Sequence, residues 1–323
     1  RQDYGCRWSD QLHNSFRQPL SIRMHLMKIS DSLKEDIADA PNWFHQAIEA
    51  KLEQKKYAFN GHEVAYQKWD IDDEEQLTVL IHGTGAHSKW WDPIAPLLKS
   101  KGTIIAPELP GMGDTSHFDK YDFELFKDAV LGVIESEGML KRKIFLVGHS
   151  LGGHLAAYIA SEMPELVSGL IIIDSPIRPP DYDYDKHISS GPLRPIKYYS
   201  SKREILSRFR LMPPQECKND WYLRFIAEFS IKETSDGWRW KFDDRLFRSL
   251  KRLDGYGFSF SCPALFISGS DSLLLGSKIM KYMQSAFSEI MEFKVIKDAA
   301  HHVLVDKPLE LAELINMELK KWN

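Results

Sequence analysis

One serine in this sequence stands in a setting that suits nucleophilic chemistry. The pentapeptide Gly148-His149-Ser150-Leu151-Gly152 follows an apolar run and precedes an Ala-rich stretch with a helical pattern. A strand, a sharp turn and a helix are therefore predicted, with the serine at the turn. Such a turn pushes the hydroxyl into the open, and the two glycines, which have no Cβ, let the apposed backbones pass. Ser150 is the predicted nucleophile.

A serine nucleophile needs a base that takes up a proton and returns it. Histidine suits this task because its ordinary pKa, near ~6.5, lies close to neutral pH. His301 follows the weak apolar run of residues 293–299 near the end of the chain, and it is the predicted base. Its neighbour His302 is the competing candidate. His149, next to the serine, is expected to shape the turn rather than to react.

These motifs together resemble those of the α/β-hydrolase family, from about Tyr57 to the end of the chain. The GHSLG turn, the His82-Gly83-Thr84-Gly85 loop and the ELPGMGDT turn at 108–115 all resemble family motifs, and so does a His followed five residues later by Asp and seven later by Pro. The resemblance implies an eight-stranded, mostly parallel sheet with helices on both faces and a helical cap inserted after the sixth strand. It also implies an oxyanion hole formed by the backbone N–H groups of Thr84 and Leu151.

The third member of a catalytic triad is a carboxylate that orients the histidine. The chain order serine, acid, histidine points to the loop after the apolar run 264–270, where Asp271 is the predicted acid. The family more often carries its acid three residues after the glycine, and that position holds Ser272 here. Asp174, at the end of the run 169–173, is the alternative, because some lipases of the family place their acid after the sixth strand.

The remaining pattern predicts the elements that position these residues. Continuous apolar runs that alternate with helical patterns are typical of buried parallel strands in an α/β sheet. Asn60-Gly61 between alternating residues predicts a hairpin. The boundaries predicted from these patterns are an N-terminal extension with a helix at 1–56, a first core part at 57–175, a helical cap at 176–261 and a second core part at 262–323.

Composition excludes several classes of function. The 323 residues carry a formal net charge of −4, so no basic field for nucleic acid is expected. Cys6, Cys217 and Cys262 are an odd, sparse set that suits a reducing compartment. No apolar run approaches the ~20 residues that span a bilayer, and no metal, phosphate or dinucleotide motif is found. We therefore expect a cytoplasmic monomer or homodimer that acts on a small-molecule ester, with no cofactor, no metal, no nucleic-acid partner and no membrane partner.

The predicted activity is hydrolysis of carboxylic esters with a short- to medium-chain acyl group, through a Ser-His-Asp triad and an acyl-enzyme. Two alternatives stay open. The first is hydrolysis of a carbon–carbon bond in a ring-cleavage product, which needs a cation in the cap such as Arg178 or Arg194. The second is a hydrolase-like protein that binds its ligand with little turnover.

Overall fold

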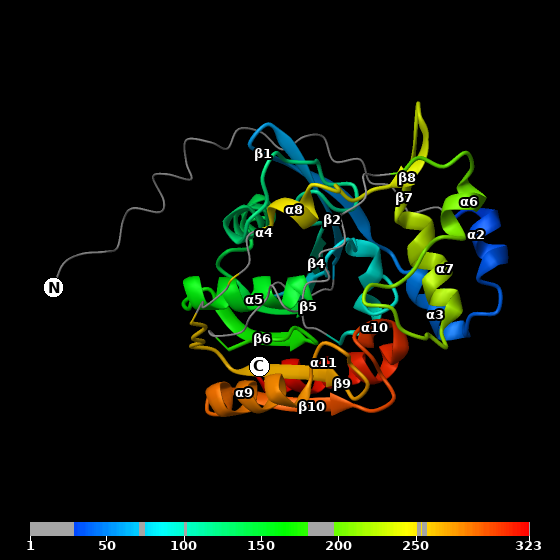
Figure 1. The fold of residues 1–323 in the computed structure, drawn as a ribbon. Coiled ribbons are helices and arrows are strands. Elements are labelled where there is room, and N and C mark those ends of the chain that lie inside the picture. The colour runs from blue at the N-terminus through cyan, green and yellow to red at the C-terminus, as the bar shows by residue number, and fades with distance from the viewer. Residues whose placement is uncertain are drawn as a thin grey trace.

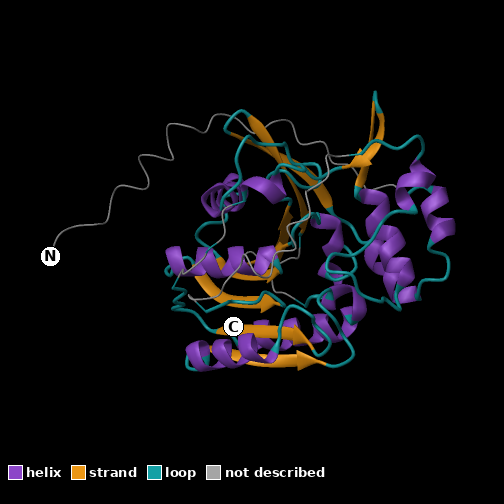
Figure 2. Ribbon diagram, viewed as in Figure 1, coloured by secondary structure: helices purple, strands orange, loops and turns teal. Residues whose placement is uncertain are grey.

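An eight-stranded sheet forms the centre of the molecule (Figures 1 and 2). The computed structural model describes residues 29–70, 75–99, 102–179, 197–250, 253 and 257–322. The strand order is β1-β2-β4-β3-β5-β6-β9-β10, and the strands from β4 to β10 in that order run parallel. The predicted fold class, a mostly parallel eight-stranded α/β sheet, is confirmed. The strands are β1 (Glu53–Phe59), β2 (His62–Trp69), β3 (Gln76–Ile81), β4 (Gly102–Pro107), β5 (Lys143–His149), β6 (Val167–Ile173), β9 (Ala264–Gly269) and β10 (Met291–Ile296).

The two antiparallel strands at one edge of the sheet, β1 and β2, form the predicted hairpin. Its turn consists of Asn60 and Gly61, whose φ angles are 49° and 79°. Both angles lie in the left-handed region that asparagine and glycine tolerate best, so this dipeptide fixes the register. The hairpin then joins the rest of the sheet through the antiparallel pairing of β2 with β4.

Helices cover both faces of the sheet, as the strand–helix alternation predicts. One apolar core lies under α4, α5 and α9, and the other contains side chains of α3, η1, α10 and α11. None of the helices in the described ranges is long and apolar enough to cross a bilayer. The bounds are η1 (Ser88–Trp91), η2 (Ala95–Leu97), α4 (Phe123–Ser136), α5 (Leu151–Glu162), α9 (Ser277–Phe287), α10 (Val303–Asp306) and α11 (Pro308–Lys321).

The segment between β6 and β9 leaves the sheet, and its described residues 197–240 lie beyond the carboxyl ends of the parallel strands (Figure 1). It contains helices α6 (Lys202–Leu206), α7 (Asp220–Phe229) and α8 (Leu246–Ser249), and also a hairpin of β7 (Ile231–Thr234) and β8 (Gly237–Trp240). The segment is therefore not wholly helical. Gly237 has a φ of 115°, so it supplies the backbone conformation that turns one strand into the next.

The N-terminal helices α2 (Asp31–Asp36) and α3 (Asn42–Ile48) pack against α7 rather than only against the sheet (Figure 1). Phe44 is fully buried, and its ring lies 4.5 Å from that of Trp221 and 5.6 Å from that of Phe225, centre to centre. The apolar residues at helical spacing within 31–56 thus form a stripe that packs against the rest of the molecule. The strand β1 begins at Glu53, four residues before the predicted start of the core.

Candidate active site

Ser150 lies at the tight turn between β5 and α5, as the pentapeptide predicts. Its φ is 55° and its ψ is −119°, a conformation that is strained for a residue with a side chain. A Cβ on Gly148 would lie 2.1 Å from the Gly152 carbonyl oxygen, and a Cβ on Gly152 would lie 2.2 Å from that of Ile81. Both glycines are therefore sterically required. The Ser150 N–H donates to the carbonyl of Ile173 at 3.0 Å, which ties the turn to the end of β6.

A chain of two contacts joins the serine hydroxyl to a buried carboxylate. The Nε2 atom of His301 lies 3.1 Å from the Oγ of Ser150, and its Nδ1 atom lies 2.8 Å from the Oδ1 of Asp174. A carboxylate only accepts, so Nδ1 carries the proton and Nε2 is left to accept the hydroxyl proton. This is the tautomer that a general base needs.

The Asp174 carboxylate is fully buried and is held by several donors. Its Oδ2 accepts from the N–H of Gly269 at 3.0 Å, and its Oδ1 accepts from the hydroxyl of Ser272 at 2.6 Å as well as from His301. The residue adopts a φ of 47°, and its own N–H donates to Ile267 at 2.8 Å. These bonds compensate for the loss of solvent around a buried charge.

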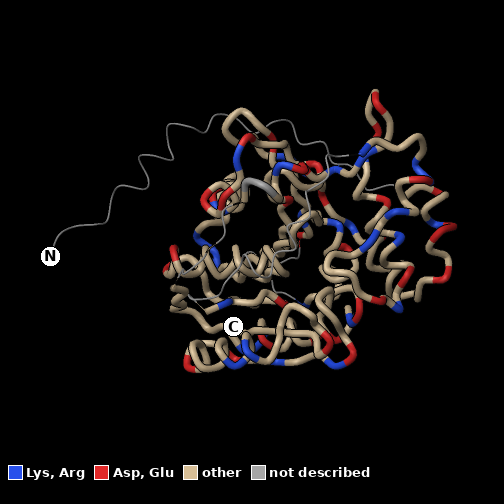
Figure 3. The backbone as a smooth tube through the Cα atoms, viewed as in Figure 1, with Lys and Arg blue, Asp and Glu red and all other residues tan. Residues whose placement is uncertain are grey.

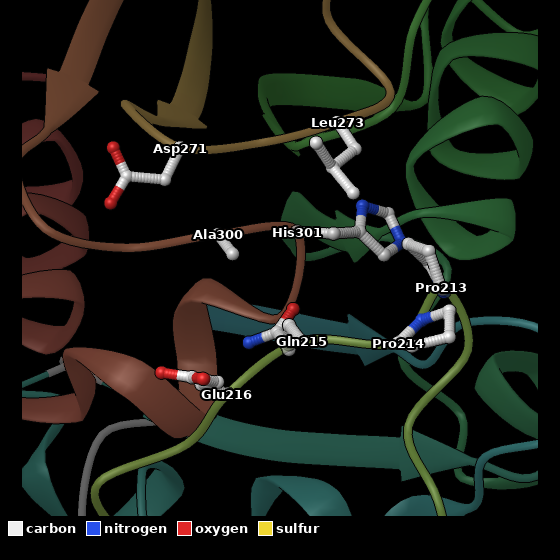
Figure 4. Close-up of a pocket in the computed structure, with 8 residues that line it drawn as sticks. All are labelled: Pro213, Pro214, Gln215, Glu216, Asp271, Leu273, Ala300 and His301. Atoms are coloured by element: carbon white, nitrogen blue, oxygen red, sulfur yellow. The ribbon is translucent and has the colours of Figure 1, made fainter.

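Asp271 does not lie where the sequence prediction requires it. Its side chain is exposed, and its Oδ1 accepts from the hydroxyl of Ser270 at 2.9 Å, so the contact expected of it with His301 is made by Asp174 instead. Its N–H donates to Ala299 at 2.9 Å, and its carboxylate points away from His301 (Figure 4). The next side chain along the loop, Ser272, faces the triad. Two consecutive residues of this loop therefore point in different directions, one to solvent and one to the site.

His302, the competing base, is engaged elsewhere. Its Nδ1–H and its backbone N–H both donate to the Oε1 of Gln215, at 2.8 and 2.9 Å. Burial, followed by the nearby His301, lowers the pKa of His302 to about 3, so the ring stays neutral. The amide nitrogen of Gln215 in turn donates to the Oδ2 of Asp306 at 2.8 Å, and that oxygen also accepts from the N–H of Ala300. Gln215 thus fixes the loop that carries His301.

His149 links the nucleophile turn to the base. Its Nε2–H donates to the carbonyl oxygen of His301 at 3.0 Å, and only 2% of the residue is exposed. Burial, followed by the two neighbouring histidines, lowers the pKa of His149 well below its usual range. The residue holds the His301 backbone against the turn while staying uncharged, which agrees with the shaping role predicted for it.

The loop after β3 lies against the serine. A Cβ on Gly83 would sit 3.1 Å from the Cβ of Ser150. The ring of His82 spans the loop, because its Nδ1–H donates to the Gly83 carbonyl at 2.8 Å and its Nε2 accepts the N–H of Leu109 at 3.0 Å. Burial lowers the pKa of His82 to about 4, so this bridge is made by a neutral ring. Within the described residues, neither the Thr84 N–H nor the Leu151 N–H donates to a protein acceptor.

The segment between β6 and β9 is anchored on the chain that follows this loop. The hydroxyl of Tyr222 donates to the carbonyl of Trp90 at 2.8 Å, and the Nε2 of His87 lies 3.0 Å from the hydroxyl of Ser230. Toward the loop itself, the rings of Phe242 and Phe247 each lie 3.9 Å from the place where a Cβ on Gly85 would stand. Aromatic side chains of this segment therefore lie over the loop beside the serine.

A pocket of about 250 Å³ lies on one side of His301 (Figure 4). Two of its lining residues are acidic, Asp271 and Glu216, and in the described chain neither is ion-paired. Figure 3 shows basic and acidic residues interspersed along the described chain, so this pair is a local feature. The lining consists of Pro213, Pro214, Gln215, Glu216, Asp271, Leu273, Ala300 and His301.

The sequence prediction missed the role of two residues at this site. In the sequence Ser272 is only a departure from the family motif, and Gln215 belongs to no motif. No local pattern signals Gln215, but a serine at the usual acid position, together with an aspartate ending the neighbouring strand, could have favoured Asp174.

Of the predicted cap cations, Arg194 lies outside the described residues. In the described part of the chain, no three His, Cys, Asp or Glu side chains are placed to hold a metal ion.

Comparisons with known proteins agree on one family. A model of the alpha/beta hydrolase family matches residues 78–314. A protein from Haemophilus influenzae whose name contains the words esterase/lipase is 25% identical over 245 residues, which are 76% of this chain and 83% of that one. Methylesterase 9 of Arabidopsis thaliana is 26% identical over 250 residues, 73% and 94% of the two chains. An esterase structure from Mycobacterium tuberculosis superposes with a TM-score of 0.68 at 19% identity, covering 92% and 100%.

Proposed function

Because this chain belongs to the alpha/beta hydrolase family, we propose that it hydrolyses carboxylic esters, with Ser150 as nucleophile, His301 as base and Asp174 as the acid that orients the base. The observation that carries this proposal is the continuous set of contacts from Ser150 Oγ through His301 to Asp174, at 3.1 and 2.8 Å. The esterase names of two relatives support the choice of ester over other substrates of this fold.

The reaction begins when the Oγ of Ser150 attacks the ester carbonyl carbon. The hydroxyl proton passes to the Nε2 of His301, and the carbonyl oxygen becomes an oxyanion. The resulting imidazolium is stabilised by the Asp174 carboxylate at Nδ1. When the intermediate collapses, the bond to the alcohol oxygen breaks and His301 gives its proton to the leaving alcohol. Water then repeats both steps on the acyl-enzyme, with His301 again as base, and frees the acid and Ser150.

The oxyanion needs donors that are already in place. The N–H of Leu151, at the start of α5, is one candidate because the first N–H groups of a helix have no partner within it. The N–H of Thr84 is the second. Since the C=O and N–H of one peptide point in opposite directions, the bond from His82 to the Gly83 carbonyl also fixes the direction of the Thr84 N–H. Each such donor contributes about 3 kcal/mol to transition-state stabilisation.

The segment 176–261 is proposed as a cap over this site. Its support is the anchoring of α7 on η1 and the position of Phe242 and Phe247 against the loop of the oxyanion donors. Beside the base, the pocket of about 250 Å³ is of a size for a short or medium-length chain rather than a bulky lipid. The two carboxylates that line it, those of Asp271 and Glu216, favour an ester that is uncharged or cationic in the part lying there, since like charges repel.

The proposal is tested with a fluorophosphonate label and a panel of p-nitrophenyl esters of graded acyl length. The wild-type protein is expected to react with the label and to turn over the shorter esters, and Ser150→Ala to lose about a millionfold in kcat. His301→Ala is expected to lose a comparable amount. Ester hydrolysis by Ser150→Ala at the parental rate would contradict the proposal.

A further inference from the structure

The Asp174 carboxylate is hydrogen-bonded to a serine from the end of the neighbouring strand, through the same oxygen atom that contacts the base. Asp174 follows β6 and Ser272 lies in the loop after β9. The Oδ1 of Asp174 accepts from the hydroxyl of Ser272 at 2.6 Å and from the Nδ1–H of His301 at 2.8 Å. The serine hydroxyl therefore shares with the base the one carboxylate oxygen on which the orientation of the base depends.

This shared oxygen has little other support. Gly269 donates its N–H to Oδ2, the other oxygen, so a carboxylate that lost Ser272 would be held at Oδ1 by the histidine alone. The carboxylate is fully buried, so the loss of a donor leaves it with fewer hydrogen bonds to offset its loss of solvent. A hydrogen bond to a charged group is also among the stronger ones that proteins make. The hydroxyl of Ser272 thus restrains rotation of the group that orients His301.

On the basis of the proposed function, we infer that Ser272 is a positioning residue of the triad, and that the acid itself can be supplied from position 272. The geometry is the reason for both parts. The hydroxyl oxygen of Ser272 and the Nδ1 atom of His301 contact the same oxygen, the Oδ1 of Asp174. The carboxylate of an aspartate at position 272 therefore enters the space beside Nδ1. Position 272 is also the one to which the family resemblance assigns the acid. In this chain, by contrast, the loop after β9 carries the hydroxyl of Ser272, and the end of β6 carries the carboxylate of Asp174.

The first test compares Ser272→Ala with a matched change two residues away. Ser270 belongs to the same loop, but its hydroxyl contacts Asp271 and the N–H of Asp298, not the triad. We expect Ser272→Ala to lower kcat about ten- to a hundredfold with little change in KM, because only the orientation of the base is affected. Ser270→Ala is expected to keep the parental kcat, and Ser272→Thr, which retains the hydroxyl, to recover most of the loss.

The Ser272 hydroxyl also accepts the N–H of Leu274 at 3.4 Å, so a merely structural role has to be separated from positioning. A structural role would lower the melting temperature and the amount of active protein, and titration of active sites with a fluorophosphonate corrects kcat for that. Equal kcat per active site in Ser272→Ala and Ser270→Ala would overturn the positioning role.

The second test moves the acid. Asp174→Asn is expected to lose about ten-thousandfold in kcat, as removal of a triad carboxylate does. Asp174→Asn combined with Ser272→Asp is expected to regain about a hundredfold or more of that loss, since a carboxylate returns to the same space. The matched double variant, Asp174→Asn with Ser270→Asp, is expected to regain nothing. Equal activity of the two double variants would overturn the second part.

The inference and the proposed function fail in different ways. If Ser150→Ala hydrolyses esters like the parent, the proposed function is wrong and the Ser272 result has another meaning. If the parent labels and turns over, Ser150→Ala is dead and the Ser272 variants behave like the Ser270 variants, only the inference is wrong. Failure of the Asp174→Asn/Ser272→Asp protein to fold would overturn the second part, because position 272 then does not supply the acid, and the comparison of Ser272→Ala with Ser270→Ala still decides the positioning role.

Discussion

The nucleophile turn and the acid position are built in different ways. The turn is local: β5, Ser150 and α5 follow one another, and the residues that allow the turn, Gly148 and Gly152, stand two positions away on either side. The acid position is assembled from three distant segments, namely the end of β6, the loop after β9 and the loop that carries His301. A short peptide specifies the first region, whereas only the folded sheet specifies the second.

This difference explains why the acid was the uncertain member of the triad. A steric requirement on neighbouring residues leaves a pattern that is legible in the sequence. A carboxylate only has to reach the imidazole, and it can do so from either of two adjacent strands, because β6 and β9 pair in parallel and end at the same edge. Loop geometry within one or two residues then decides, as it does for Asp271 and Ser272.

The sharpest way to break this comparison is to remove each of the two carboxylates in turn. Asp174→Asn is expected to lower kcat about ten-thousandfold, because the amide no longer stabilises the imidazolium or enforces its tautomer. Asp271→Asn is expected to change kcat on an uncharged ester by no more than about a factor of three, because an exposed charge is screened by solvent. Steady-state kinetics on a neutral p-nitrophenyl ester measure both.

Circular dichroism and thermal melts serve as the control, since Asp174 is fully buried and its loss can affect folding. The reverse ranking, with Asp271→Asn inactive and Asp174→Asn active, would restore the prediction made from the sequence and show that the loop after β9 rearranges when substrate binds.

A second experiment tests the nucleophile side of the comparison through the loop that contacts it. Replacing Thr84 by proline removes the N–H proposed as an oxyanion donor, and kcat is expected to fall about a hundred- to a thousandfold. Thr84→Ala keeps that N–H and loses only the side chain, so it is expected to stay within about threefold of the parent. If both variants lose the same amount, the side chain rather than the amide matters. Melting temperatures show whether proline is accommodated at this position.

Much of the fold follows from patterns that the sequence displays. Five of the six parallel strands are buried, continuous apolar runs, β10 at the edge of the sheet is a weaker and partly exposed one, and the hairpin turn is marked by Asn60-Gly61. Ser150 and His301 lie together as expected, because motif and chain order constrain them strongly. The acid did not follow from the sequence, since the side chain that faces the triad in the loop after β9 depends on the bond from Asp271 N–H to Ala299.

The segment 176–261 and the N-terminal helices were less predictable for another reason. The β7–β8 hairpin has half-buried strands of four residues each, too short to give a clear alternation. The stripe of apolar residues within 31–56 is divided between α2, which ends at Asp36, and α3, which begins at Asn42 directly after Pro41. That this stripe packs on α7, through Phe44 and Trp221, is a tertiary fact with no local signal.

A third experiment measures stability at different pH values, because the loop beside the nucleophile turn depends on a neutral His82. Burial lowers the pKa of His82 to about 4, below the value near ~6.5 expected in the unfolded chain. The contribution of neutral His82 to the free energy of unfolding is therefore complete above about pH 6.5. It is lost as pH falls toward 4, a change of about 3 kcal/mol. Urea unfolding at several pH values between these limits measures the decline.

The matched variant for this experiment is His82→Asn, whose amide nitrogen can still donate to the Gly83 carbonyl but does not titrate. It is expected to be less stable at neutral pH and to show a shallower decline in acid. The other buried histidines remain, so the decline does not vanish. Parallel stability–pH curves for the parent and His82→Asn would show that His82 is not the group responsible.

The smallest expected effect concerns Asp271, whose side chain is exposed in the loop after β9. If the pocket beside His301 receives part of the substrate, Asp271→Lys should shift selectivity from an ester with a cationic alcohol toward one with an anionic alcohol, by several-fold in kcat/KM. Asp236→Lys, at the exposed turn of the β7–β8 hairpin, changes the net charge equally but lies outside the pocket, and it should shift nothing. Because the charge is exposed, the effect should shrink in about 1 M salt, where the screening length is about 3 Å. A shift of equal size in both variants would mean that overall charge, not the pocket, governs the preference.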